Sequence, residues 1–136
     1  MELDLSVAIQ CDSRYPVNRK LLRSRVLQVL TRHRLSGKVF VSVSIVGDRK
    51  MVALNKQFRN KDYAADVLSF PTYDPTQPME DGGFAHPDEA GLVLGDTVVS
   101  YPQAVKIASQ KRKFLDETIG DLVEHSLMHL LGIHHD

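Results

Sequence analysis

The chain has 136 residues, of which 43% are hydrophobic and 25% charged, so it has room for one globular domain and does not have the composition of a disordered protein. Its one cysteine, Cys11, excludes an internal disulfide framework and fits a reducing compartment. No apolar run reaches the roughly 18–20 residues that cross a membrane, and Glu2 and Asp4 stand where a secretion signal carries positive charge. We therefore expect a soluble, cytoplasmic protein with one domain over residues 1–136 and no membrane partner.

The 17 basic and 17 acidic residues cancel in total but not along the chain. Residues 1–61 hold 13 lysines and arginines against four acids, a net charge of +9, whereas residues 62–136 hold four against 13, a net charge of −9. Such asymmetry predicts a surface for a polyanion on one side of the fold. The alternative is that both sets of charges lie on solvated faces that partly neutralise each other after folding.

Hydrophobic periodicity predicts the first elements. Residues 3–9 alternate apolar and polar side chains, as in a half-buried strand, and residues 17–33 carry apolar side chains at helical spacing. Residues 39–46 form a second predicted strand, with valines and an isoleucine on one face and Ser42 and Ser44 on the other.

The remaining elements follow from breakers and capping residues. In chain order we expect a short helix capped by Asp48, a strand over 66–71, a loop over 71–90, a strand over 91–99 interrupted at Gly95-Asp96, a helix from Ser100 to about Phe114, and a last helix from near Asp116 to Gly132. The order strand, helix, strand, helix, strand, strand, helix, helix favours an α+β fold. We expect a mixed sheet of about four strands packed by helices, with a histidine-rich helix at the C-terminal end.

Four of the six histidines fall within the last 12 residues. His125 and His129 are spaced i, i+4, which places them on one face of a helix at the spacing from which two imidazoles reach one metal ion. Gly132 can end that helix and turn the chain back, so that a third ligand beyond the turn completes the set. Three histidines with an open fourth position are typical of a catalytic zinc site, since structural sites usually have four protein ligands.

The spacing of these histidines also matches the metzincin proteases, in which a glutamate directly after the first histidine acts as the general base. Here that position is Ser126. A serine hydroxyl does not take a proton from a zinc-bound water near neutral pH, so the pattern disfavours peptide hydrolysis.

Three blocks of residues make the chain resemble the YbeY family of metal-dependent endoribonucleases. Residues 125–135 are similar to the family pattern His-Gly-x-Leu-His-Leu-x-Gly-Tyr-Asp-His. Residues 55–71 resemble the family's Asn-x-x-Tyr-Arg followed by Thr-Asp-Val-Leu-Ser-Phe-Pro, and residues 94–100 resemble its Gly-Asp-Ile-Val-Ile-Ser strand. Among the departures, Ser126 replaces glycine and His134 replaces aspartate.

The resemblance implies that His125, His129 and His135 bind one zinc ion, with His134 beside them as a competing ligand. Three imidazoles also suit other divalent metals. The resemblance further implies that Arg59 binds phosphate, since a guanidinium offers a bidentate fork to phosphate oxygens.

Alternative roles stay open for several residues around these motifs. Arg59 can instead be a surface arginine paired with Asp62 or Asp66. Asp96 is a candidate for supporting a ligand or contacting a partner, or it caps backbone amides in a turn. Asp121, one turn before His125, can accept the second ring proton of that histidine or remain a solvated acid. Ser69 and Phe70 are interpreted as strand packing.

By this resemblance we expect a zinc-dependent endoribonuclease that hydrolyses single-stranded RNA, processes the 3′ end of small-subunit ribosomal RNA and takes part in ribosome quality control. The expected partners are ribosomal RNA and the small ribosomal subunit. Basic residues between Arg14 and Lys61 are expected to follow the phosphate backbone, and the low aromatic content argues against base-specific readout. A second hypothesis is a metal-binding ribosome-assembly factor with little hydrolytic activity, and a third is a metalloprotease.

Overall fold

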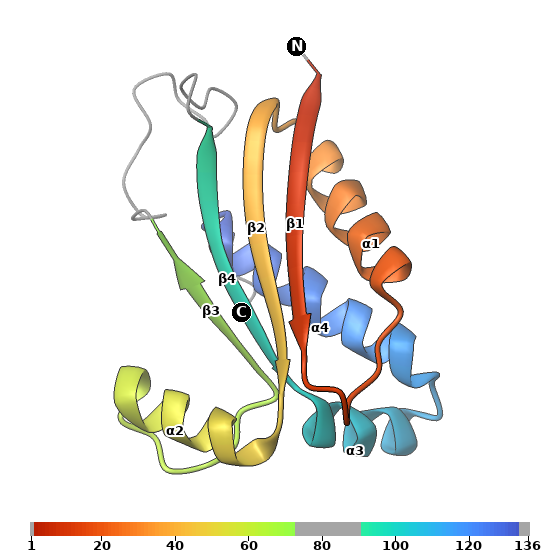
Figure 1. The fold of residues 1–136 in the computed structure, drawn as a ribbon, viewed down its shortest axis with the longest axis vertical. Helices are drawn as coiled ribbons and strands as arrows, with labels where there is room; N and C mark the ends of the chain where they lie inside the picture. The colour runs from red at the N-terminus through yellow and green to blue at the C-terminus, as the bar shows by residue number, and fades with distance from the viewer. Residues whose placement is uncertain (1, 73–90, 134–136) are drawn as a thin grey trace.

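The computed structural model describes residues 2–72 and 91–133 and contains eight elements in the predicted order (Figure 1). The elements are β1 (Leu3–Cys11), α1 (Arg19–Arg32), β2 (Gly37–Val46), α2 (Asp48–Arg59), β3 (Val67–Pro71), β4 (Leu92–Ser100), α3 (Tyr101–Lys111) and α4 (Leu115–Leu130). The predicted α+β class and the mixed sheet of four strands are confirmed. Most of the predicted loop over 71–90, namely residues 73–90, lies outside the described residues.

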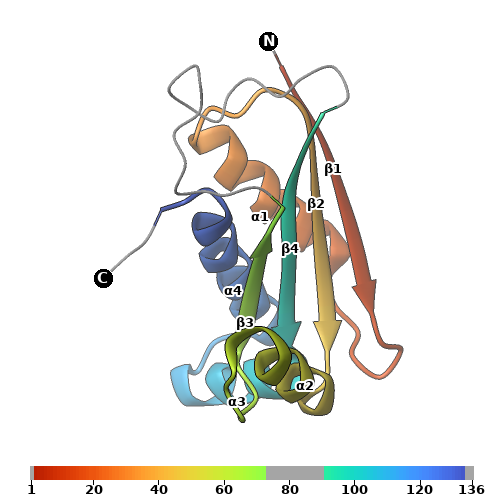
Figure 2. The same cartoon turned by 90° about the vertical axis from the view of Figure 1, so that its left-hand side faces the viewer.

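The four strands form one sheet in the order β1-β2-β4-β3. The pairs β1–β2 and β2–β4 are parallel, and β3 pairs antiparallel with β4 at the edge. Helices α1 and α4 lie on the same side of the sheet, as the two views in Figures 1 and 2 agree. The strand order brings β3 to an edge, where it lies against the C-terminal half of α4.

The main core lies between the sheet and the helices α1 and α4. Alternate residues of β2 are buried there, as the alternation predicted, while Ser42 and Ser44 lie on the other face and are only half-buried. The fully buried members of this core include Val39, Val43, Leu22, Val26, Leu30, Ile119, Val123 and Leu127. Each helix buries one apolar stripe, which fixes the side of α4 that is left to carry polar residues.

Helix α2 packs through a separate, smaller cluster on the opposite face of the sheet. The buried members of this cluster are Met51, Ala65, Leu68 and Val98. Thr97 hydrogen-bonds to α4, so the next residue of the strand, Val98, points to the other face. The buried Asn55 amide donates to the carbonyl of Tyr63 at 3.0 Å and thereby joins α2 to the segment that leads into β3.

The predicted interruption at Gly95 is a bulge in a continuous strand. The register with β2 advances from Phe40↔Val93 to Val41↔Gly95, so β4 holds one extra residue at this point. Gly95 has a φ of +153°, and a Cβ there would lie 2.6 Å from the carbonyl oxygen of Phe70 and 2.8 Å from a Leu130 methyl group. Only glycine fits, because β3, β4 and α4 approach one another closely here.

Two local predictions are wrong in detail. Gly47, and not Asp48, is the N-cap of α2; the Asp48 carboxylate instead accepts hydrogen bonds from the Ser100 hydroxyl at 2.7 Å and from the Gln103 amide. Helix α3 ends at Lys111 rather than near Phe114. The predicted cap at Ser100 is confirmed, since its hydroxyl accepts from the backbone NH of Gln103.

Ion pairs between α1 and α4 partly neutralise the opposed charges of the two halves. Arg25 binds Asp121 at 2.9 Å and also Glu124, and Arg32 lies 3.9 Å from Glu124. Lys113 adds a second cation on Asp121. The neutralising alternative therefore holds for this part of the basic half.

The basic residues of α2 and of the turn after it are not neutralised by ion pairs in the way that those facing α4 are. They are Arg49, Lys50, Lys56, Arg59 and Lys61, all exposed. Within residues 2–72 and 91–133, none of them is ion-paired. These residues of α2 are therefore one part of the basic half that stays available to a polyanion, and Lys20, Arg23, Arg34 and Lys38 are also exposed without an ion pair among the described residues. None of the described helices is long and apolar enough to cross a membrane.

The ion pairs on α4 predict a pH dependence of stability. Partial burial raises the pKa of Asp121, but hydrogen bonds from Lys113 and Arg25 outweigh it, so that its pKa in the fold lies below the ordinary 3.8. A lowered folded-state pKa stabilises the fold above the unfolded-state pKa, and this stabilisation is lost as pH falls through the folded-state value. We expect Asp121→Asn to lower the free energy of unfolding by up to about 1 kcal/mol at pH 7, because the pair is partly exposed.

Urea unfolding of wild type and Asp121→Asn between about pH 7 and pH 3 measures this effect. The difference between the two proteins should shrink as the pH drops below 3.8. Glu117→Gln, an exposed change on the first turn of α4, is the matched control. A difference that stays constant down to pH 3 would contradict the role of the Asp121 charge.

Candidate active site

The two described histidines of α4 point their ring nitrogens at each other. The Nε2 atoms of His125 and His129 are 3.1 Å apart, and the ring centroids are 4.6 Å apart in an edge-to-face arrangement. His125 is exposed and His129 is half-buried. The i, i+4 prediction therefore leads to two imidazoles that converge on one point at the protein surface.

This geometry fits a shared metal ion. Two nitrogens that each lie about 2.0–2.1 Å from a tetrahedral ion are separated by about 3.3–3.4 Å, close to the observed 3.1 Å. No group of three or more His, Cys, Asp or Glu residues that could hold a metal is found in the part of the chain that the structure describes. The predicted third ligand, His135, and its neighbour His134 lie outside the described residues, so two ligands of the predicted set are placed.

The end of α4 turns the chain as the sequence predicts. Gly132 has a φ of +80°, its NH donates to the carbonyl of His129 at 2.9 Å, and the NH of Ile133 donates to the carbonyl of Met128 at 2.8 Å. These two bonds form a Schellman motif, which satisfies the last carbonyls of a helix. The helix ends at Leu130, one residue after His129, the second predicted ligand.

The histidines form one wall of a cleft of about 670 Å³. The opposite wall is the C-terminal end of α2 with Phe58 and Arg59, and the floor is the edge strand β3 with the residue before it. Arg59 is exposed and forms no ion pair with Asp62, Asp66 or any other described residue. The fold thus brings Arg59 and two predicted metal ligands, some 66 residues apart in sequence, to the same cleft.

Beneath the histidines, three hydroxyl groups join α4 to the sheet. The Ser126 hydroxyl is fully buried and lies 2.7 Å from both the Thr97 and the Ser69 hydroxyls. Ser126 therefore faces the sheet and not the cleft, which adds a geometric reason to the chemical one against its acting as a base. The sequence alone did not reveal this network, although a polar residue on the apolar side of the α4 pattern was a signal for it.

Two aromatic rings line the cleft next to Arg59. Phe58 and Phe70 pack edge to face with ring centroids 5.1 Å apart, and Phe58 remains 58% exposed. Ser69 and Phe70 pack within the fold as predicted, Ser69 against Ser126 and Phe70 against the cluster around Met51, and both also line the cleft. The sequence places these phenylalanines in different elements, so their pairing depends on the fold.

Neither of the two acidic candidates lines the cleft. Asp96 is exposed on β4 opposite Ser42, on the sheet face turned away from α4, and does not line the cleft. Asp121 is bound by Arg25 and Lys113 and its side chain is 42% exposed, so in the described structure it is an ion-paired, partly solvated acid and not a partner of His125.

Comparison with known proteins identifies the family of the chain. The family model described as endoribonuclease YbeY matches residues 9–136. The endoribonuclease YbeY of Alkaliphilus metalliredigens is 41% identical over 95 residues, covering 70% of this chain and 57% of that protein. The endoribonuclease YbeY of Moorella thermoacetica is 35% identical over 128 residues, covering 90% of this chain and 78% of that protein.

A solved structure shares the fold. The solution structure of TM1509 from Thermotoga maritima superimposes with a TM-score of 0.58 at 22% identity, covering 96% of this chain and 75% of that one. The matches to several curated relatives, among them proteins of Anaeromyxobacter and Alkaliphilus, span 44% to 58% of the relatives' length. From the match over residues 9–136 and these identities, the chain belongs to the endoribonuclease YbeY family.

Proposed function

We propose that the protein is a zinc-dependent endoribonuclease that cleaves single-stranded RNA in the cytoplasm, acting on the 3′ end of small-subunit ribosomal RNA and in ribosome quality control. The observation that carries the proposal is the single cleft shared by two converging imidazoles and an arginine that has no ion pair among the described residues. RNA as the substrate is supported by the endoribonuclease activity named for its relatives.

In this proposal His125 and His129 hold the metal together with His135. A zinc ion bound there supplies Lewis acidity toward a phosphoryl oxygen and a water whose pKa is lowered toward about 7. The exposed His125 ring leaves that side of the cleft open to a large polymer.

Arg59 binds and orients the phosphate in the same cleft. A phosphodiester keeps one negative charge in the ground state and gains charge in the transition state, so a cation that needs no rearrangement stabilises the transition state. Because Arg59 has no carboxylate partner in the described structure, its guanidinium is available to two phosphate oxygens.

Phe58 supplies a reason for single-strand selectivity. Its exposed ring, held by Phe70, offers a flat apolar surface beside the phosphate-binding arginine. An unpaired base can stack there, worth about 1–3 kcal/mol, whereas a base inside a duplex keeps its faces stacked on its neighbours. Stacking of this kind tolerates any sequence, which fits the expectation of no base-specific readout.

The test is a cleavage assay of the zinc-loaded protein with a single-stranded RNA, the same RNA as a duplex, and a peptide library. We expect cleavage of the single strand only. Phe58→Ala should raise KM for that strand about tenfold, from the loss of about 1.4 kcal/mol of stacking. Phe114→Ala removes a ring that is 80% exposed and outside the cleft, so it should leave KM unchanged.

Other outcomes would each contradict one part of the proposal. Peptide cleavage without RNA cleavage would favour the metalloprotease. Binding to small ribosomal subunits without any cleavage would favour the assembly factor. Equal KM values for Phe58→Ala and Phe114→Ala would remove the stacking role while leaving the nuclease intact.

A further inference from the structure

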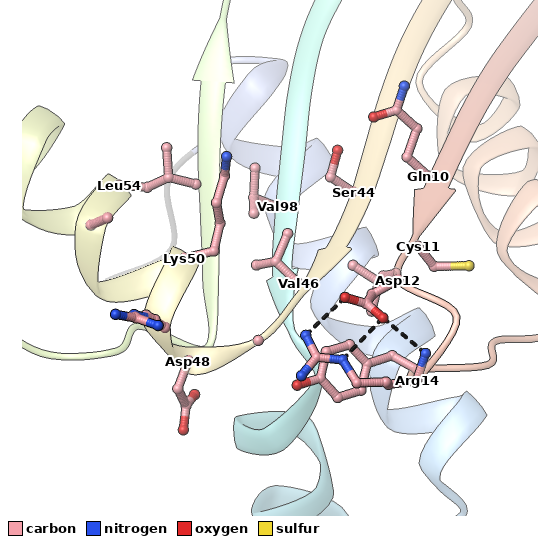
Figure 3. A pocket seen from close by; sticks show the side chains of 15 residues that line it. Gln10, Cys11, Asp12, Arg14, Ser44, Val46, Asp48, Lys50, Leu54 and Val98 are labelled. Carbon is pink, nitrogen blue, oxygen red and sulfur yellow. Dashed lines mark hydrogen bonds and ion pairs between the residues drawn. The ribbon is translucent and has the colours of Figure 1, made fainter.

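A second depression lies at the carboxyl ends of β1 and β2 and shares no residue with the histidine cleft. We call it the crevice; it has a volume of about 860 Å³ and is shown in Figure 3. The chain leaves β1 toward α1 on one face of the sheet and leaves β2 toward α2 on the other face. In open sheets with parallel strands, ligands bind where consecutive connections diverge in this way.

The acids of the crevice are satisfied within the protein. Asp12 accepts two side-chain hydrogen bonds from Arg14, at 3.1 and 2.8 Å, and these hold the pKa of Asp12 at about 2. The Asp48 carboxylate accepts from Ser100 and Gln103 and points away from the depression in Figure 3. Neither acid is therefore available to neutralise a cation elsewhere in the crevice.

Two basic side chains of α2, one arginine and one lysine, supply positive charge in the crevice. Arg49 and Lys50 both line the crevice and have no ion-pair partner among residues 2–72 and 91–133. Figure 3 draws Lys50 along the apolar wall between Leu54 and Val98. In this position the ammonium group can bind a phosphate, while the apolar side chains beside it can pack against an apolar part of the same ligand.

Neutral hydrogen-bonding groups complete the lining. The amide of Gln10 and the hydroxyl of Ser44 stand on the open face of the sheet in Figure 3. In the described residues, neither side chain has a hydrogen-bond partner. Apolar wall, amide, hydroxyl and cation together match the parts of a nucleotide: a base with polar edges and an anionic phosphate.

Helix α2 links the crevice to the histidine cleft. Lys50 and Leu54 on its first turns line the crevice, and Phe58 and Arg59 at its end line the cleft. Twelve residues at 1.5 Å each make the helix about 18 Å long. One RNA strand of a few nucleotides can thus reach from Lys50 in the crevice to Arg59 in the cleft along a single helix.

We propose that the crevice binds a nucleotide of the same RNA strand that is cut in the histidine cleft, with its phosphate on Lys50 and its base against Leu54 and Val98. The inference rests on the proposed ribonuclease function. A free mononucleotide has the same chemistry, but the continuous path along α2 favours the flank of an RNA strand.

The test measures binding apart from cleavage, in the full chain carrying His129→Ala so that the RNA stays intact. The probes are fluorescent oligouridines of about four and about 16 nucleotides, and AMP as the free nucleotide. We expect Lys50→Ala to weaken binding of the long oligonucleotide about fivefold and to reduce the slope of log Kd against log salt by about 0.7, the loss of one phosphate contact. The short oligonucleotide should bind equally well to both proteins.

Lys106→Ala is the matched control, because Lys106 is an exposed lysine on α3 outside both sites. If Lys50→Ala and Lys106→Ala weaken the long oligonucleotide equally, or if Lys50→Ala weakens the short one as much, the proposal is wrong. If AMP competes with the long oligonucleotide when Lys50 is present but not in Lys50→Ala, the crevice is a site for free nucleotides instead. Cleavage by the parent protein, assayed separately, tests the nuclease function whatever the result for Lys50.

Discussion

Replacing His129 with alanine should abolish both metal binding and RNA cleavage. The half-buried His129 ring holds its Nε2 atom 3.1 Å from that of His125, so its removal takes away one of the two proposed ligands that the structure describes. Changes around a metal site that do not touch the ligands already cost 10- to 100-fold in affinity or activity. We expect a loss of at least about 100-fold in kcat/KM and a zinc content near zero after dialysis, measured by atomic absorption.

A control on the same helix separates this effect from a loss of folding. Glu117→Ala changes an exposed side chain of the first turn of α4 and should keep both the zinc content and the activity. Circular dichroism should show the same helical signal for both variants. Cleavage that survives His129→Ala at the wild-type rate would point to a contaminating nuclease and refute the zinc mechanism.

Replacing Arg59 with alanine should slow cleavage while leaving the metal in place. Removal of one preorganised group that stabilises transition-state charge costs about 100- to 1000-fold in kcat. Arg59→Lys should recover only part of the rate, because an ammonium group offers a point charge where the guanidinium offers a bidentate fork. Single-turnover kinetics at saturating RNA measure this step without a contribution from binding.

Arg23→Ala is the matched control for charge, since Arg23 is an exposed arginine of α1 outside the cleft. It should change the salt dependence of binding without changing the single-turnover rate. An Arg59→Ala variant that retains the wild-type rate but binds RNA less tightly would make Arg59 a binding residue only.

The sequence was informative wherever a pattern is local. Alternation in residues 39–46 correctly assigned the buried and exposed faces of β2, and the Ser100 cap and the Gly132 turn are as expected. The i, i+4 spacing of His125 and His129 correctly predicted their proximity. In each case the relevant neighbours lie within about five residues, so that backbone geometry alone decides the outcome.

Features that depend on distant contacts could not be predicted in this way. Aspartate is a preferred N-cap residue, which is why the sequence predicts that role for Asp48. Its carboxylate instead accepts hydrogen bonds from Ser100 and Gln103, which are more than 50 residues away. The partners of Ser126 are likewise contributed by β3 and β4. The charge split could not decide between a polyanion surface and mutual neutralisation. The fold decides it locally, because α1 packs beside the acidic residues of α4 and α2 does not.

The separate packing of α2 has a consequence for the dynamics of the cleft. His125 and His129 belong to α4, which packs in the large core with α1 and the sheet, whereas Arg59 belongs to α2, which is held by the small cluster around Met51. Elements with few buried contacts open locally at a lower free energy than the whole molecule. We therefore expect the end of α2 to open locally more readily than α4, and in the proposed function this lets Arg59 move away from the imidazoles as cleaved RNA leaves while α4 stays folded.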